Sequence, residues 1–79
     1  MSTDTIREIL AQHGRLSQSI EELQNSSDLY NAGLTSLATV GVMLALEDEF
    51  DIEFPDSMLS RKTFSSIESI AETIEELQE

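Results

Sequence analysis

The chain of 79 residues contains no cysteine, only one proline and only three glycines. Without cysteine it can form no disulfide framework, no thiolate metal site and no cysteine nucleophile. Its longest apolar run, residues 42–46, is far shorter than the roughly 20 residues that a membrane helix needs. No basic segment followed by an apolar one stands at the N-terminus, so no secretion signal is visible and a cytoplasmic location is expected.

Basic residues are scarce as well, with four Lys and Arg against sixteen Asp and Glu and a net charge of −12. Such a surface repels nucleic acid and anionic membranes, so we expect neither partner, and partner proteins should be basic where they dock. The acids Glu47, Asp48 and Glu49 gather at the end of an expected helix, where the macrodipole prefers cations. Local stability does not explain them. They form either a simple solvated face or a docking surface.

Residues suited to catalysis or metal binding are few. His13 is the only histidine, and a lone histidine near a helix end is usually a surface residue. No glycine-rich phosphate loop is present. Residues 51–56 carry alternating acids, but they lack the glycine of a calcium-binding loop and contain Pro55, which disfavours a calcium sensor. We assign no catalytic residue and no metal ligand.

Hydrophobic periodicity predicts an all-α fold in a single domain, residues 1–79. We expect a small antiparallel bundle with main helices at about 3–13 and 36–50 and a third near the C-terminus, plus a short helix from Pro55 and a long first loop. Ser65 and Glu68 form a capping-box pattern before the last helix. The expected inner faces of the first and last helices are Ile6, Ile9 and Leu10, and Ile67, Ile70, Ala71, Ile74 and Leu77.

For the second helix, the three- and four-residue spacing predicts an inner stripe of Leu37, Val40 and Leu44, with Met43 as a further candidate. Gly41 inside this helix costs up to about 1 kcal/mol relative to alanine. We therefore expect another helix or a ligand to pack closely there. The long loop before this helix should be anchored by its apolar residues, Leu29, Tyr30 and Leu34.

Residues 28–37 bring a serine, Ser36, to the start of the second helix. A serine in this position most often caps the helix, as Thr35 could also do. The position also suits a covalently attached phosphate, because unpaired N–H groups and the positive end of the helix dipole stabilise an anion there.

This segment resembles the modification motif of the acyl and peptidyl carrier protein family in Asp28-Leu29, Gly33, Ser36 and Leu37. The resemblance continues through the acidic second helix, residues 50–55 and the closing helix. It implies an acyl-carrier-like fold and a 4′-phosphopantetheine arm, taken from coenzyme A, on Ser36. It also implies an acyl or aminoacyl cargo held on that arm as a thioester, and a protein that is not itself an enzyme.

The resemblance also implies partners: a phosphopantetheinyl transferase, a loading ligase and downstream transferases, all with basic docking surfaces, acting on a monomeric carrier. The residues expected to dock are Thr35, Leu37, Val40, Glu47, Asp48 and Glu49. Thr35 departs from the family, which usually has Asp before the modified serine. Several stretches are most similar to small stand-alone bacterial carriers, some of which are loaded with amino acids by synthetase-like ligases. The cargo stays open between an amino acid and a fatty or polyketide acyl chain.

A second hypothesis is an acidic helical adaptor that binds basic proteins and carries no prosthetic group. The adaptor needs the acidic second helix, as the carrier does, but Ser36 would be expendable. Attachment at Ser36 is therefore the feature that separates the two hypotheses.

Overall fold

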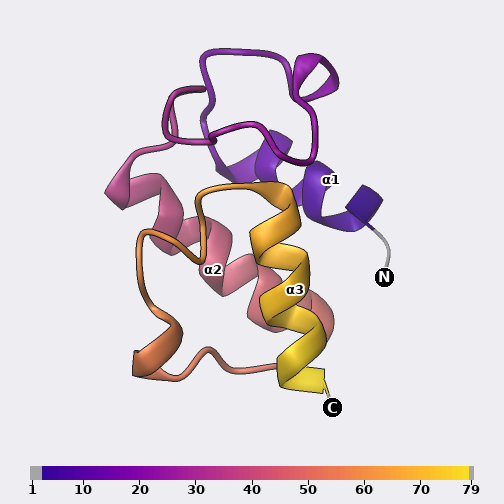
Figure 1. Ribbon diagram of the computed structural model, residues 1–79, viewed down its shortest axis with the longest axis vertical. Coiled ribbons are helices and arrows are strands. Elements are labelled where there is room, and N and C mark those ends of the chain that lie inside the picture. The colour runs from indigo at the N-terminus through magenta and orange to yellow at the C-terminus, as the bar shows by residue number, and fades with distance from the viewer. Residues whose placement is uncertain (1–2, 79) are drawn as a thin grey trace.

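A computed structural model describes residues 3–78 and contains three α-helices, α1 (Thr3–His13), α2 (Ser36–Phe50) and α3 (Ile67–Gln78). Two single-turn 3-10 helices, η1 (Ile20–Glu22) and η2 (Asp56–Met58), lie in the connections. The helix α1 packs against both α2 and α3, and it runs roughly opposite to α2 (Figure 1). Residues 3–78 form no strand, so the predicted all-α fold with a long first loop is confirmed. None of the helices in this range is long and apolar enough to cross a membrane.

The inner faces of α1 and α3 are those that the periodicity predicts. The buried residues of these two helices are Ile6, Ile9, Leu10, Ile67, Ile70, Ala71 and Ile74. The predicted cap of α3 is displaced by one residue, because Ser66, not Ser65, accepts a hydrogen bond from the backbone N–H of Ser69, at 3.0 Å. The Ser65 hydroxyl instead donates to the carbonyl of Lys62 at 2.8 Å.

The inner face of α2 differs from the prediction. Leu37, Val40 and Leu44 are 84%, 50% and 56% exposed, so the expected inner stripe lies on the surface, and only Met43 is half-buried. The face turned to the core carries Ala38, Val42 and Leu46. The spacing misleads here because α2 is apolar around most of its circumference before Glu47, so both stripes fit a helical repeat.

The expected close packing of a helix on Gly41 is also absent. A Cβ atom built on Gly41 would have no atom within 4 Å, apart from its chain neighbours and the local helix backbone. Nothing in the described part of the chain therefore requires glycine at this position.

The first loop, residues 14–35, is held down by backbone hydrogen bonds to distant segments. The N–H of Leu29 donates to the carbonyl of Ser65 at 2.7 Å, and the N–H of Glu68 donates to the carbonyl of Asn25 at 2.9 Å. Of the predicted anchors, Leu29 and Leu34 are buried and Tyr30 is half-buried. The loop is thus fixed against α3, and this positions the start of α2.

The guanidinium of Arg7 ties the first half of this loop to α1. Its Nη1 donates to the carbonyl oxygens of Ile20 and Leu23 at 3.0 and 2.9 Å, and its Nη2 donates to Oδ1 of Asn25 at 2.8 Å. The two bonds to carbonyl oxygens are partly buried, so water replaces them poorly, whereas the bond to Asn25 is exposed.

We expect the substitution Arg7→Gln to lower the free energy of unfolding by about 2 kcal/mol, because it leaves partly buried carbonyls without a charged donor. Urea unfolding followed by circular dichroism measures the loss. The matched control is Arg15→Gln, an exposed arginine two residues after the end of α1, which should change stability by less than about 0.5 kcal/mol. Equal effects of the two substitutions would contradict the role given to Arg7.

Candidate functional site

Thr35, not Ser36, caps the helix α2. The Thr35 hydroxyl oxygen accepts from the backbone N–H of Ala38 at 3.1 Å, and its carbonyl oxygen accepts from the N–H of Thr39 at 2.9 Å. Thr35 has the extended backbone typical of an N-cap, with φ −102° and ψ 165°. The explanation of Ser36 as a simple cap is thereby removed.

Three residues of the segment before α2 shape its path. Oδ1 of Asp28 accepts from the N–H of Tyr30 at 2.9 Å, which forms a tight turn, and Leu29 is fully buried in the core. Gly33 has φ +109°, and a Cβ there would lie 2.8 Å from the backbone nitrogen of Ser17. Only glycine fits such a position without strain.

The next two positions of the motif have no such structural role. Ser36 is exposed at the first turn of α2, and no hydrogen bond of its hydroxyl is present within residues 3–78. Leu37 beside it is 84% exposed. The motif thus consists of residues that build the turn, followed by a serine and a leucine turned toward solvent.

The start of α2 is suited to hold an anion. The first N–H groups of a helix have no intrahelical acceptor. Thr35 accepts from the N–H groups of Ala38 and Thr39, and within residues 3–78 those of Ser36 and Leu37 have no partner. These two donors and the positive end of the helix dipole would stabilise a phosphodiester on the Ser36 hydroxyl.

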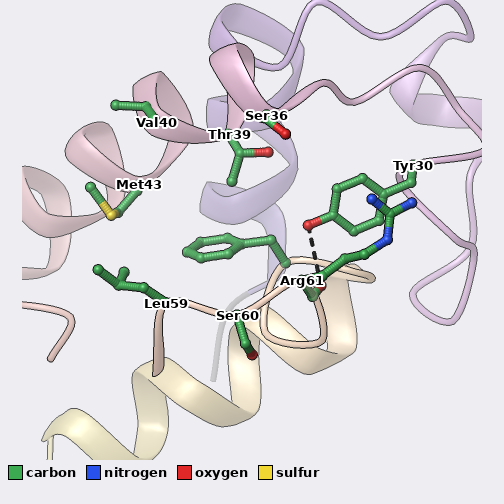
Figure 2. Close-up of a pocket in the computed structure, with 9 residues that line it drawn as sticks. Tyr30, Ser36, Thr39, Val40, Met43, Leu59, Ser60 and Arg61 are labelled. Carbon is green, nitrogen blue, oxygen red and sulfur yellow. Dashed lines mark hydrogen bonds between the residues drawn. The ribbon is translucent and has the colours of Figure 1, made fainter. Parts of the chain in front are cut away.

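Ser36 also lies at the edge of a hollow of about 320 Å³, which we call the Ser36 hollow. Figure 2 shows Tyr30 and Arg61 at one side of it and Val40, Met43 and Leu59 at the other, with Ser36 and Thr39 between them. Ser60 and Phe64 complete its wall. The hollow therefore offers polar groups near Ser36 and apolar surface further along α2.

A stacked pair forms the polar side of the Ser36 hollow. The guanidinium of Arg61 lies 3.9 Å from the centre of the Tyr30 ring, and the Tyr30 hydroxyl donates to the backbone carbonyl of Arg61 at 3.2 Å (Figure 2). Partial burial raises the pKa of the Tyr30 phenol above its ordinary value. The phenol is protonated at neutral pH even without this shift, so it acts as a donor. The pair joins the first loop to the segment after η2. Tyr30 and Arg61 are 31 residues apart in the sequence, and no motif links them, so this pair could not be predicted.

The acids at the end of α2 divide into two kinds. The Glu47 carboxylate accepts from the backbone N–H of Phe54 at 2.9 Å, and its side chain is half-buried. Glu47 therefore has a local structural role, which no sequence pattern indicates. Asp48 and Glu49 are exposed. A helix end that carries two exposed acids against its own dipole gains nothing in stability from them.

The structure thus brings Ser36, Leu37, Val40 and Leu44 to one exposed side of α2, with Asp48 and Glu49 further along the same helix. The spacing of Leu44 predicts a core position, but the structure places its side chain on this exposed surface. Within residues 3–78 no group of three or more Asp, Glu or His side chains is arranged to hold a metal ion. The start of α2 therefore presents an exposed serine next to both apolar and acidic surface.

Comparison with known proteins gives the family. Residues 4–74 match the family model described as a phosphopantetheine attachment site. The chain belongs to this family, in which 4′-phosphopantetheine is the prosthetic group. It is 51% identical over 70 residues to the aminoacyl carrier protein of Agrobacterium fabrum, an alignment that covers 89% of this chain and 84% of that protein. It is also 40% identical over 52 residues to the D-alanyl carrier protein of Streptococcus uberis, covering 65% of this chain and 66% of that protein.

Solved carrier structures have the same fold. The carrier protein from Agrobacterium tumefaciens, crystallised with an engineered Bradyrhizobium japonicum glycine:[carrier protein] ligase and AMP, superposes with a TM-score of 0.91 and is 49% identical. That match covers 94% of this chain and 99% of the other. A holo acyl carrier protein from Nitrosomonas europaea has a TM-score of 0.81 and 34% identity, and the match covers 94% and 92% of the two chains. The comparisons give no support to the adaptor hypothesis.

Proposed function

We propose that Ser36 is the residue that carries the 4′-phosphopantetheine arm. The main support is that Thr35, not Ser36, caps α2. The exposed Ser36 hydroxyl is therefore not needed for the helix and is available for attachment of the arm. A phosphopantetheinyl transferase would join this hydroxyl oxygen to the phosphorus of the phosphopantetheine half of coenzyme A. The pyrophosphate bond of coenzyme A breaks in this step, the nucleotide half leaves with its two phosphates, and the hydroxyl proton is lost.

The residues of this chain fit such a group. The N–H groups of Ser36 and Leu37 have no acceptor within residues 3–78 and would be available to a phosphate on Ser36, and the hydroxyls and apolar side chains of the Ser36 hollow suit an arm with amide and methyl groups. When bound, the arm supplies the thiol that a cysteine-free chain lacks, and the cargo is held on it as a thioester. The role of the protein itself is to anchor the arm and to present it, and we propose no catalytic residue in it.

We propose an aminoacyl cargo. The support is the 51% identity to an aminoacyl carrier protein and the similarity to a carrier bound by a glycine-loading ligase. A ligase that activates an amino acid is then the loading partner, and a transferase that accepts the aminoacyl group acts after it. We further propose that the chain acts as a single monomeric domain in the cytoplasm.

The exposed side of α2 is the proposed docking surface. Leu37, Val40 and Leu44 supply apolar contact area next to Ser36, and Asp48 and Glu49 supply charge for basic residues of a partner. Thr35 and Glu47 border this surface. Rim charges of this kind speed association and select partners more than they tighten the complex, which suits a carrier that must be released after each transfer.

Mass spectrometry of the protein purified from its own cells tests this proposal. Under conditions that preserve thioesters, the peptide containing Ser36 should carry one phosphopantetheine arm, and the arm should carry an aminoacyl group that hydroxylamine releases. A Ser36 peptide that is always unmodified would refute the carrier assignment. A fatty acyl group on the arm would refute the aminoacyl cargo alone.

A further inference from the structure

A second hollow, of about 650 Å³, lies between the end of α1 and the start of α2. Gln12, His13 and Arg15 line it from the α1 side, and Thr35, Leu37 and Gly41 line it from the α2 side. We call it the α1–α2 hollow. Neither Ser36 nor any other residue at the mouth of the Ser36 hollow lines it, so the two hollows lie on different sides of α2.

Two residues of the α1–α2 hollow are unfavourable for folding alone. Gly41 lies inside a helix with open space around its Cβ position, where alanine would add up to about 1 kcal/mol of stability. Arg15 has a left-handed backbone with φ 51°, a conformation that glycine or asparagine adopts more easily. Folding alone would favour a side chain at 41 and glycine at 15. A partner molecule would explain both residues. Glycine at 41 lets the partner come close to the helix, and Arg15 provides a positive charge for it.

The charge of the α1–α2 hollow is opposite to that of the protein as a whole. None of the side chains that line it is acidic, although the chain has sixteen Asp and Glu residues, and the charged group in it is Arg15, next to His13. The start of α2 adds the positive end of a helix dipole. Of the three arginines, Arg7 bonds the first loop and Arg61 stacks on Tyr30. Arg15 has neither kind of partner within residues 3–78.

We propose that the α1–α2 hollow is a second docking surface, which takes an acidic segment of a partner enzyme. A carboxylate of that segment pairs with Arg15, its backbone lies over Gly41, and an apolar side chain beside the carboxylate packs on the exposed Leu37. Because Asp48 and Glu49 at the other end of α2 require basic groups, the two contacts have opposite signs. The helix can then dock in only one direction, which brings Ser36 to a fixed place in the partner. This inference rests on the proposed carrier function.

Binding to two enzymes tests the proposal: a broad-range phosphopantetheinyl transferase and the Bradyrhizobium japonicum glycine:[carrier protein] ligase. Arg15→Glu should raise the dissociation constant of at least one complex about fivefold to tenfold, because attraction becomes repulsion at a partly exposed contact. Arg15→Gln should give a smaller rise. The control Lys62→Glu changes the net charge by the same amount on the exposed segment before α3, and it should have little effect.

A second variant tests whether the backbone of the partner segment lies over Gly41. Gly41→Gln should raise the melting temperature, since it improves helix propensity in open space, and it should weaken the same complex as Arg15→Glu by filling the hollow. A weaker complex from a more stable protein cannot result from damage to the fold.

These experiments distinguish failure of the second docking surface from failure of the proposed carrier function. If the unsubstituted protein acquires no arm from coenzyme A, the proposed function fails. If it acquires the arm, but Arg15→Glu binds both enzymes like Lys62→Glu, or more tightly than the unsubstituted protein, the second docking surface alone is refuted. Tighter binding would mean that the partner is basic at this end of α2 as well.

Discussion

The substitution Ser36→Ala is expected to abolish attachment of the arm while the fold stays intact. Incubated with coenzyme A, Mg²⁺ and a broad-range phosphopantetheinyl transferase, the unsubstituted protein should gain the mass of one arm, and the variant should gain none. The loss is complete because no other side chain can replace the hydroxyl oxygen that bonds to phosphorus. The free energy of unfolding should change by less than about 0.5 kcal/mol, since Ser36 is exposed and is not the cap of α2.

The matched control is Ser57→Ala, which removes another exposed hydroxyl, from η2, and should be modified like the unsubstituted protein. If Ser36→Ala still acquires an arm, the attachment residue is elsewhere. If Ser36→Ala unfolds, then Ser36 supports the helix after all, and the division of roles between Thr35 and Ser36 is wrong. Thr35→Ala gives the complementary result: it should lower stability by about 1 kcal/mol through loss of the cap.

Ser36 could be proposed as the attachment residue from the sequence because residues 28–37 resemble the motif of the family, and the structure gives several residues of that motif a physical role. A turn that needs an Asx-type hydrogen bond and a positive φ must contain residues such as Asp28 and Gly33, and a buried anchor such as Leu29 must be apolar. These requirements fix the spacing before the helix. What the sequence could not decide is which hydroxyl caps α2, because Thr35 and Ser36 are both good caps. The hydrogen bond from Ala38 to Thr35 decides it.

The face of α2 that packs in the core could not be predicted, because the helix carries two apolar stripes. A helix that only packs has one apolar stripe, and its position can be read from the spacing. In α2 one stripe packs in the core, while a second, with Leu37, Val40 and Leu44, stays on the surface. The spacing predicts an inner position for Leu37 and Val40, whereas the docking role expected of them requires an exposed position. Their exposure rules out the inner position.

The Tyr30–Arg61 stack and the α1–α2 hollow could not be predicted for a different reason. Each joins residues from separate segments whose spatial relation depends on how the first loop is tied down. That loop is fixed by backbone hydrogen bonds to Ser65 and Glu68 and by the guanidinium of Arg7. Backbone bonds are made by any residue type, so they leave no pattern in the sequence.

Two leucines on α2 provide the most direct test of the corrected helix face. Leu46 is fully buried, and Leu44, two residues earlier, is 56% exposed. We expect Leu46→Ala to lower the free energy of unfolding by about 2–5 kcal/mol, because it leaves a cavity in the core. In a domain this small such a loss is a large share of the total stability. Leu44→Ala should change stability by less than about 0.5 kcal/mol, measured for both variants by urea unfolding.

The originally predicted face requires the opposite order, with Leu44→Ala the more damaging of the two, so the ranking alone decides between the two orientations of α2. The Leu46→Ala and Leu44→Ala variants also distinguish effects on stability from effects on partner binding. Leu44→Ala should weaken binding to a partner enzyme without loss of stability, since its side chain belongs to the exposed apolar surface beside Ser36. We expect the Leu44→Ala variant to keep its fold and its arm but to be loaded with cargo less efficiently. This result would show that the exposed apolar stripe of α2 takes part in partner recognition and that the buried stripe alone is sufficient for the core.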